Sequence, residues 1–350
     1  MSAEHRQRLL ASGGVPSDAV YVTADLPTVR YLTGFSGSSA TVVVDGPRFV
    51  LITDGRYREQ AAAECSGVEV VIQRDVVVAL EEVLTERSLN LDERASLSLV
   101  AGLQAAGFAV RPMPDPVMTL REIKDHDELQ YLETAGSITA DALAQEVTRV
   151  RVGDREVDIA RRLEARFGEL GAEDRAFPTI VASGPNSAVP HHRASNRPLA
   201  PGDLLVIDCG AMVGGYHADM TRTFVVGAEP ADWQRDVHDV VFAAQQAARD
   251  AVSPGASASE VDDAARSVVA QHGFADFFTH GTGHGVGLQI HESPMLSASN
   301  GEELGDRFVV TVEPGVYLPG RGGVRIEDTV VVGDPLQVLT PMDRALTRVG

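Results

Sequence analysis

The sequence contains few cysteines, few aromatic residues and almost no lysine. Lys124 is the only lysine, so arginine supplies nearly all of the positive charge. Lysine and arginine together number 30 against 50 acidic residues, which gives a formal net charge of −20. Proteins that bind phosphate backbones cluster their basic residues, and this sequence has no basic run. We therefore expect no nucleic-acid partner.

Disulfides and membrane-spanning segments are also not indicated. Cys65 and Cys209 lie far apart and form no disulfide framework, a pattern typical of a reducing compartment. No apolar run approaches the length that crosses a bilayer, and the first residues show neither a long apolar core nor a cleavage pattern. The sequence predicts a soluble cytoplasmic protein with no membrane partner.

The length of 350 residues is comfortable for two domains. The first part alternates strand and helix patterns typical of an α/β domain. We expect strands at 19–24, at 68–73 and on both sides of the turn Asp45-Gly46-Pro47 in 41–54, with a helix at 57–65. Three prolines then fall within residues 112–116, a density that no helix continues through. We therefore predict two domains, 1–117 and 118–350.

The second part repeats one order of elements, two helices followed by strands. The expected helices are 124–150, 157–170, 232–252 and 257–272, and the expected strands are 177–183, 204–212, 221–227, 307–317 and 324–333. Such self-similarity suggests an internal duplication, and a site between two similar halves would take ligands from both.

Four acidic residues interrupt the strands predicted in the second part, although strands are normally depleted in Asp and Glu. They are Asp208, Asp219, Glu313 and Glu327. Taken singly, each fits a surface position on a half-exposed strand. Taken together in apolar strands, they need a cation, a proton or hydrogen bonds, because a buried lone carboxylate is costly.

A turn brings the first two of these acids together. Gly214-Gly215 is a suitable two-residue hairpin turn, and it would place Asp208 opposite Thr221. Asp219 is then a diagonal neighbour on the same face, about 7–8 Å away at the backbone. The sequence therefore predicts that two carboxylates converge from neighbouring strands.

Residues 280–291 read HGTGHGVGLQIH and place three histidines among four glycines. Ordering glycine-rich backbone costs entropy, so some function should require it. Four carboxylates and one imidazole form an oxygen-rich ligand set that suits Mn²⁺ better than a thiolate zinc site. They are enough for two ions about 3.5 Å apart. We expect one histidine to bind metal and two to face the substrate; the alternative is that they are surface histidines.

Six segments carry a resemblance to the pita-bread metallopeptidases, and within them to the Xaa-Pro branch of aminopeptidase P and prolidase. They are RYLTGFSGSSA…FVLITDGRYREQA, SGPNSAVPHH, IDCGAMVGGYHADMTRTF, HGTGHGVGLQIHESP, VEPGVY and GGVRIED. The resemblance implies an α/β two-domain fold. It pairs a small creatinase-like N-terminal α/β domain, with a ribonuclease-H-like mixed sheet, and a C-terminal pita-bread α+β domain with an internal pseudo-twofold duplication. It also implies a homodimer.

The same resemblance implies a set of site residues. The implied ligands of two divalent ions are Asp208, Asp219, His284, Glu313 and Glu327. The ions implied are Mn²⁺ first, with Co²⁺, Fe²⁺ and Zn²⁺ as alternatives. The implied substrate-facing residues are His191, His280, His291 and Arg325, and Thr221 would support the ligands. His192 is a departure, because family members often carry an aromatic residue there, and this bears on the lining of the substrate pocket.

The implied reaction is hydrolysis of the bond between an N-terminal residue and proline. Proline fixes φ and has no N–H, so this bond suits a dedicated site. Glu313 is the candidate to move a proton to the leaving amine, and His291 to stabilise the carbonyl oxygen. The sequence leaves open whether dipeptides or longer peptides are cleaved. A methionine aminopeptidase-like enzyme and an inactive pita-bread module that binds peptides or proteins remain the alternatives.

Overall fold

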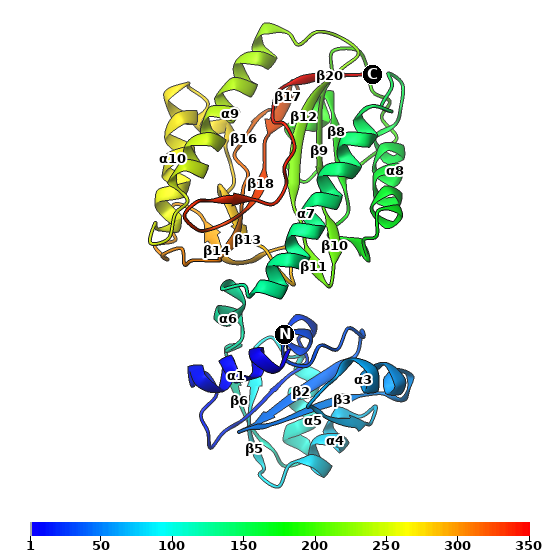
Figure 1. The fold of residues 1–350 in the computed structure, drawn as a ribbon, viewed down its shortest axis with the longest axis vertical. Helices are drawn as coiled ribbons and strands as arrows, with labels where there is room; N and C mark the ends of the chain where they lie inside the picture. The colour runs from blue at the N-terminus through cyan, green and yellow to red at the C-terminus, as the bar shows by residue number, and fades with distance from the viewer. Residues whose placement is uncertain (1) are drawn as a thin grey trace. The chain divides into compact units, whose positions relative to one another are not determined.

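The computed structural model describes residues 2–350 and divides into two compact units (Figure 1). The first unit ends at Arg121, and the second spans Glu122–Gly350. The division falls within helix α6 (Met118–Glu122), which follows the proline-rich segment where we placed a boundary after residue 117. Among residues 2–350, no helix has the length and apolarity that a membrane span requires.

The first unit contains a mixed six-stranded sheet in the order β4-β3-β2-β1-β5-β6. Neighbours β1–β2 and β2–β3 are antiparallel, and the other three pairs are parallel. The strands are β1 (Val20–Thr23), β2 (Ala40–Asp45), β3 (Arg48–Thr53), β4 (Glu69–Ile72), β5 (Ser88–Asp92) and β6 (Ala109–Met113). The helices are α1 (Ser2–Ser12), α2 (Leu26–Thr33), α3 (Arg58–Glu64), α4 (Val76–Val83) and α5 (Leu97–Ala105), with a 3₁₀ turn at Gly55–Tyr57.

Local chemistry accounts for this sheet. Asp45 pairs with Arg48 across the turn, where Gly46 has a φ of 53°, a left-handed conformation that glycine adopts without strain. The predicted hairpin is therefore confirmed. Apolar side chains of the strands, such as Ile52, pack against Leu80 of α4 and Leu103 of α5 to form the core.

The second unit holds two main sheets, β20-β12-β9-β8 and β14-β13-β15-β18-β19, with two smaller ones, β11-β10-β7 and β16-β17. The helices are α7 (His126–Val147), α8 (Glu156–Glu169), α9 (Asp232–Ala251) and α10 (Ala258–Gln271), with 3₁₀ turns at Gly184–Ala188 and Ala275–Phe277. Strands before α9 are β7 (Asp174–Arg175), β8 (Ile180–Ser183), β9 (Leu204–Cys209), β10 (Ala211–Val213), β11 (Tyr216–His217) and β12 (Met220–Val226). Strands after α10 are β13 (Gly283–Gly285), β14 (Glu292–Leu296), β15 (Val309–Val312), β16 (Gly315–Leu318), β17 (Gly322–Arg325), β18 (Asp328–Val331), β19 (Gln337–Val338) and β20 (Thr347–Val349).

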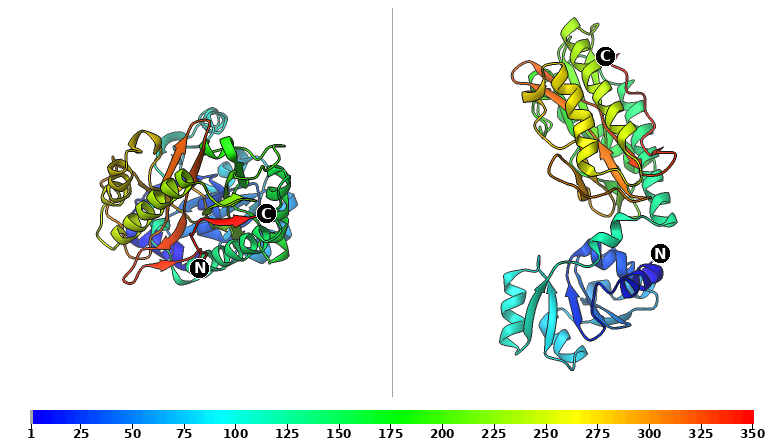
Figure 2. Two further views of the ribbon diagram at one scale, coloured as in Figure 1. Left: turned by 90° about the horizontal axis from the view of Figure 1, so that it is seen from above. Right: turned by 90° about the vertical axis from the view of Figure 1, so that its left-hand side faces the viewer.

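Two helix pairs cover the strands of this unit (Figure 2). Leu143 of α7 and Leu163 of α8 lie in one core with Ile207 of β9. Val241 of α9 lies in another core with Val310 of β15. This order, two helices and then strands, is the predicted one, and the internal duplication stays a prediction.

The acidic residues differ from our expectation in their local structure. Asp208 lies inside β9, but Asp219, Glu313 and Glu327 lie in short breaks between strands. The pairing of β15 with β18 ends at Val312 opposite Asp328, and the pairing of β16 with β17 begins at Gly315 opposite Arg325. Pro314 lies in this break and has no N–H to donate to a ladder. The prediction of continuous strands 307–317 and 324–333 was therefore wrong.

Candidate active site

The first two carboxylates come from a hairpin with the predicted register. Val213 is paired with Tyr216 across the glycine turn, and Asp208 is paired with Thr221. At Gly210, which separates β9 from β10, a Cβ atom would come within 1.8 Å of the Ala218 carbonyl oxygen. Only glycine permits that approach.

The second two carboxylates lie at the break where β15–β18 gives way to β16–β17. The Glu313 N–H donates to the Thr282 carbonyl at 2.7 Å, and the Glu327 N–H donates to the Thr221 carbonyl at 3.1 Å. The Thr221 hydroxyl donates to Glu327 Oε2 at 2.7 Å. Backbone and side-chain contacts thus fix Glu327 directly beside the strand that follows Asp219.

The glycines around His284 are required by close backbone packing. His284 lies in β13, between β14 and β15. A Cβ atom on Gly283 would lie 2.0 Å from the Thr311 carbonyl oxygen, and one on Gly285 would lie 2.2 Å from the Ser293 carbonyl oxygen. Because the glycines lack a Cβ atom, the neighbouring backbones can pack close to β13 and place the imidazole of His284. This close packing is the function that requires ordered glycine here, despite its entropy cost.

The ligand atoms of the site converge around His284. One carboxylate oxygen each of Asp219 and Glu327 and a ring nitrogen of His284 all lie within 4.8 Å of one another. His284 Nε2 is 3.7 Å from Asp219 Oδ2 and 3.5 Å from Glu313 Oε1. Because Nδ1 donates to the Gly285 carbonyl at 3.0 Å, Nε2 of the neutral ring presents a lone pair to these carboxylates. A cation bound between these acceptor atoms would remove the repulsion between them.

Buried carboxylate oxygens without hydrogen-bond partners also indicate a cation site. Asp208 Oδ1, Asp219 Oδ1 and Glu327 Oε1 are buried and have no hydrogen-bond partner among the described residues. Burial and the neighbouring carboxylates raise the pKa of Asp219 and of Glu327, and burial raises the pKa of Glu313 to about 8 although Arg325 opposes the rise. Four carboxylates in this space need added positive charge, so these residues fit two divalent cations.

Arg325 connects the carboxylates to a histidine. Its guanidinium donates to Asp208 Oδ2 and, at 2.9 Å, to the Tyr317 hydroxyl. The Tyr317 oxygen lies 2.9 Å from His280 Nε2. Burial lowers the pKa of His280 to about 4, so its ring is neutral at pH 7. Sequence reasoning missed Tyr317, although VEPGVY contains it.

A pocket of about 950 Å³ opens onto these groups. His191 and His291 line it and are exposed, and the ring centroids of His291 and His284 are 4.5 Å apart. Burial and the neighbouring His191 lower the pKa of His291. The pocket thus brings the three predicted substrate-facing histidines and Arg325 together with the five predicted ligands. It also has a wall that the sequence did not predict, formed by the α8 residues Val157, Ala160, Arg161 and Glu164.

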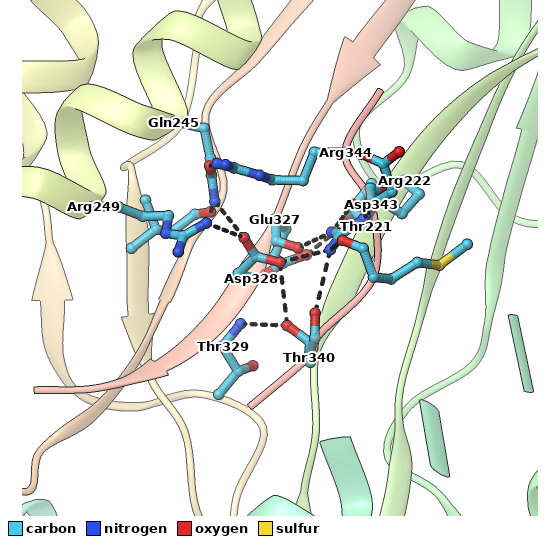
Figure 3. A network of polar contacts seen from close by, with 12 residues as sticks. Thr221, Arg222, Gln245, Arg249, Glu327, Asp328, Thr329, Thr340, Asp343 and Arg344 are labelled. Atoms are coloured by element: carbon cyan, nitrogen blue, oxygen red, sulfur yellow. Dashed lines mark hydrogen bonds and ion pairs between the residues drawn. The ribbon is translucent and has the colours of Figure 1, made fainter. Parts of the chain in front are cut away.

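A buried polar network lies behind Glu327 (Figure 3). Arg222 is 1% exposed and donates to the Glu327 carbonyl and, at 2.7 Å, to Asp328 Oδ1. Asp328 Oδ2 accepts hydrogen bonds from Gln245 at 2.9 Å and Arg249 at 3.1 Å. The network connects the backbone at Glu327 to α9 and so fixes the position of Glu327.

Two family models match the chain. Residues 130–334 match metallopeptidase family M24, and residues 5–123 match the creatinase/prolidase N-terminal domain. The curated relatives include a Xaa-Pro dipeptidase of Pyrococcus furiosus, 37% identical over 318 residues that cover 90% of each chain.

Solved structures are similar over nearly the whole chain. A Xaa-Pro dipeptidase from Bacillus anthracis has a TM-score of 0.94 at 32% identity and covers 100% of both chains. An X-Pro aminopeptidase from Thermotoga maritima has a TM-score of 0.89 at 34% identity and covers 98% of this chain and 99% of its own. The matches confirm the predicted two-domain α/β architecture.

Proposed function

This chain belongs to metallopeptidase family M24, and we propose that it is a metal-dependent peptidase that hydrolyses the bond between an N-terminal residue and proline. Its predicted resemblance to the Xaa-Pro branch of the pita-bread family is confirmed by the Xaa-Pro dipeptidases among its relatives. The observation that carries the proposal is the cluster of buried, unpartnered carboxylate oxygens around the lone pair of His284, at the base of a pocket lined by histidines.

Five residues are the proposed metal ligands: Asp208, Asp219, His284, Glu313 and Glu327. When bound, two divalent ions lower the pKa of water and so supply a nucleophile at neutral pH. We propose Mn²⁺, because four of the five ligands are carboxylates and hard oxygen ligands favour such ions over a thiolate-type site.

The other residues bind and orient the substrate. The exposed rings of His191 and His291 face the pocket, and His291 is proposed to donate a hydrogen bond to the carbonyl oxygen on which negative charge develops. His280, held by the Tyr317 hydroxyl, lies on the wall of the same pocket. Glu313 is proposed to move a proton to the leaving nitrogen of proline. Arg325 fixes Asp208 and Tyr317 relative to each other.

The assembly and location are further parts of the proposal. We propose a homodimer in the cytoplasm. The dimer is proposed from the family resemblance alone, because a single exposed apolar side chain such as Leu97, 86% exposed on α5, is ordinary on a protein surface. Sedimentation of the full chain tests the dimer.

The peptidase assay uses the full chain, Mn²⁺ and the dipeptide Ala-Pro. We expect hydrolysis that EDTA abolishes and Mn²⁺ restores. Glu327→Gln should lower kcat at least about 100-fold, because it removes a charged ligand oxygen. The matched control, Asp276→Asn, changes an exposed acid of the same unit and should leave kcat unchanged. Metal-loaded wild-type protein that cleaves no Xaa-Pro peptide would contradict the proposal.

The same assay separates the remaining alternatives. Cleavage of Ala-Pro alone indicates a dipeptidase, and cleavage of Ala-Pro-Ala as well indicates an aminopeptidase. Cleavage of Met-Ala peptides without Xaa-Pro activity would instead indicate a methionine aminopeptidase-like enzyme. Absence of both metal and hydrolysis would indicate a binding module. The five intact ligand positions argue against that module.

A further inference from the structure

We propose that Glu156 is a positioning residue for the peptidase reaction, which holds the loop Ser183–Ser195 so that His191 faces the substrate pocket. The inference rests on the proposed function and adds a residue that lies outside the ligand set and the substrate-facing histidines. Glu156 is the first residue of α8, and its exposed fraction is 0%.

The Glu156 carboxylate accepts hydrogen bonds from both ends of the loop. Oε1 accepts from the Ser183 N–H at 2.8 Å, the Ser183 hydroxyl at 2.7 Å and Asn186 Nδ2 at 3.0 Å. Oε2 accepts from His192 Nε2 at 2.8 Å, the Ser195 N–H at 3.0 Å and the Ser195 hydroxyl at 2.6 Å. One side chain therefore closes a loop whose ends lie on either side of His191.

The neighbours of His191 are fixed from two directions. The ring of His192, the next residue, bonds to Glu156, and the carbonyl of Pro190, the preceding residue, accepts from Arg325 Nη1 at 3.3 Å. The loop is also tied to β17, where the Gly323 N–H donates to the Ser187 hydroxyl at 2.9 Å. The exposed imidazole of His191 is thus placed by a backbone that is anchored on α8 and on the strand bearing Arg325.

Only a carboxylate satisfies this arrangement. All six contacts are donors, three to each oxygen, so the amide group of a glutamine would present its own N–H groups to three donors. Burial opposes the charge, but the hydrogen bonds from Ser195, Ser183, Asn186 and His192 lower the pKa of Glu156 to about 2. The negative charge also lies at the N-terminus of α8, where the helix dipole favours it.

This arrangement gives a role to His192, the position at which the sequence departs from the family resemblance. His192 adds a donor to Glu156 at the edge of the pocket. The loop is then held by charge-assisted hydrogen bonds, which are stronger than neutral ones. A shift of about 1 Å in a substrate-contacting group can lower the rate about 100-fold, so the position of the loop matters for catalysis.

A double-mutant cycle with Ala-Pro and the Mn²⁺-loaded full chain tests the proposal. Glu156→Gln should raise KM and lower kcat/KM by about 10- to 100-fold. In a His191→Ala background the same substitution should change kcat/KM by less than about 3-fold, because the group that it positions is already absent.

The matched control is Glu146→Gln. Glu146 is a buried acid on α7 that pairs with Arg162 Nε at 2.7 Å. This substitution should lower thermal stability without changing KM. If Glu156→Gln fails to fold, Ser195→Ala replaces it, since it removes one donor to Glu156, together with the acceptor of the Arg197 N–H, and leaves the carboxylate in place. It should raise KM about 3- to 10-fold, again only when His191 is present.

Two results would overturn the inference in an active wild-type enzyme. One is a Glu156→Gln or Ser195→Ala variant with unchanged KM. The other is an effect of Glu156→Gln that persists in full with His191→Ala, which would indicate a role in stability alone. An inactive wild-type enzyme would instead contradict the proposed function, so the two failures are distinguishable.

Discussion

Substituting Arg222 with methionine should destabilise the second unit strongly, although Arg222 does not line the substrate pocket. Its guanidinium is buried and donates to the carbonyls of Thr221, Glu327, Met342 and Asp343 and to the Asp328 carboxylate. Methionine preserves much of the volume but donates no hydrogen bond, so the Asp328 carboxylate and the carbonyls of Glu327, Met342 and Asp343 lose this donor (Figure 3). The Thr221 carbonyl keeps the Glu327 N–H.

The expected magnitude follows from the contacts that remain. Breaking one partner of a buried ion pair costs about 3–5 kcal/mol. Asp328 keeps its hydrogen bonds from Arg249 and Gln245, which limits the loss of stability at its carboxylate. The carbonyls that accept from Arg222 keep fewer hydrogen-bond donors. We therefore expect Arg222→Met to lower the free energy of unfolding of the second unit by about 4 kcal/mol. At about 2–4 °C per kcal/mol for a domain of this size, the transition of the second unit should fall by about 8–16 °C.

Scanning calorimetry of the metal-free protein measures this shift without any contribution from bound ions. Arg321→Met is the matched control, because Arg321 is exposed and its guanidinium carbon lies 4.1 Å from the ring centroid of Trp233. Its transition should move by no more than about 2 °C. An Arg222→Met protein that melts as late as this control would show that the network does not stabilise the unit.

Three further predictions concern single groups. Gly283→Ala should abolish metal binding in a titration with Mn²⁺, because the new Cβ would lie 2.0 Å from the Thr311 carbonyl oxygen and displace β13. Glu156, with its pKa lowered to about 2, stabilises the folded state above its unfolded pKa near 4.5. Acid titration should therefore show stability lost as pH falls from about 4.5 towards 2, and the loss should be smaller in Glu156→Gln. Tyr317→Phe should lower kcat about 10-fold with little change in melting temperature, since it removes one hydroxyl between His280 and Arg325.

Much of the fold could be predicted from local patterns. Helical periodicity predicted α7 to α10 to within a few residues, and the glycine turn predicted that Asp208 lies opposite Thr221. These features depend on residues that are close in the sequence, where spacing and turn chemistry determine the structure.

The features that the sequence did not predict depend on distant parts of the chain. The breaks at Glu313 and Glu327 arise where one strand pair ends and another begins, which no local pattern indicates. Tyr317 and Glu156 act through contacts whose partners lie up to 39 residues away, such as Ser195 for Glu156. In the sequence, Glu156 is only an acid at the start of a helix, a common position for a solvated charge.

The central claim is that five side chains bind a pair of divalent cations, and a crystal structure determined with Mn²⁺ and anomalous diffraction tests it most directly. We predict two anomalous peaks per chain, with each of Asp208, Asp219, His284, Glu313 and Glu327 within bonding distance of at least one of them. No peak there, or peaks bound by other side chains, would contradict the account.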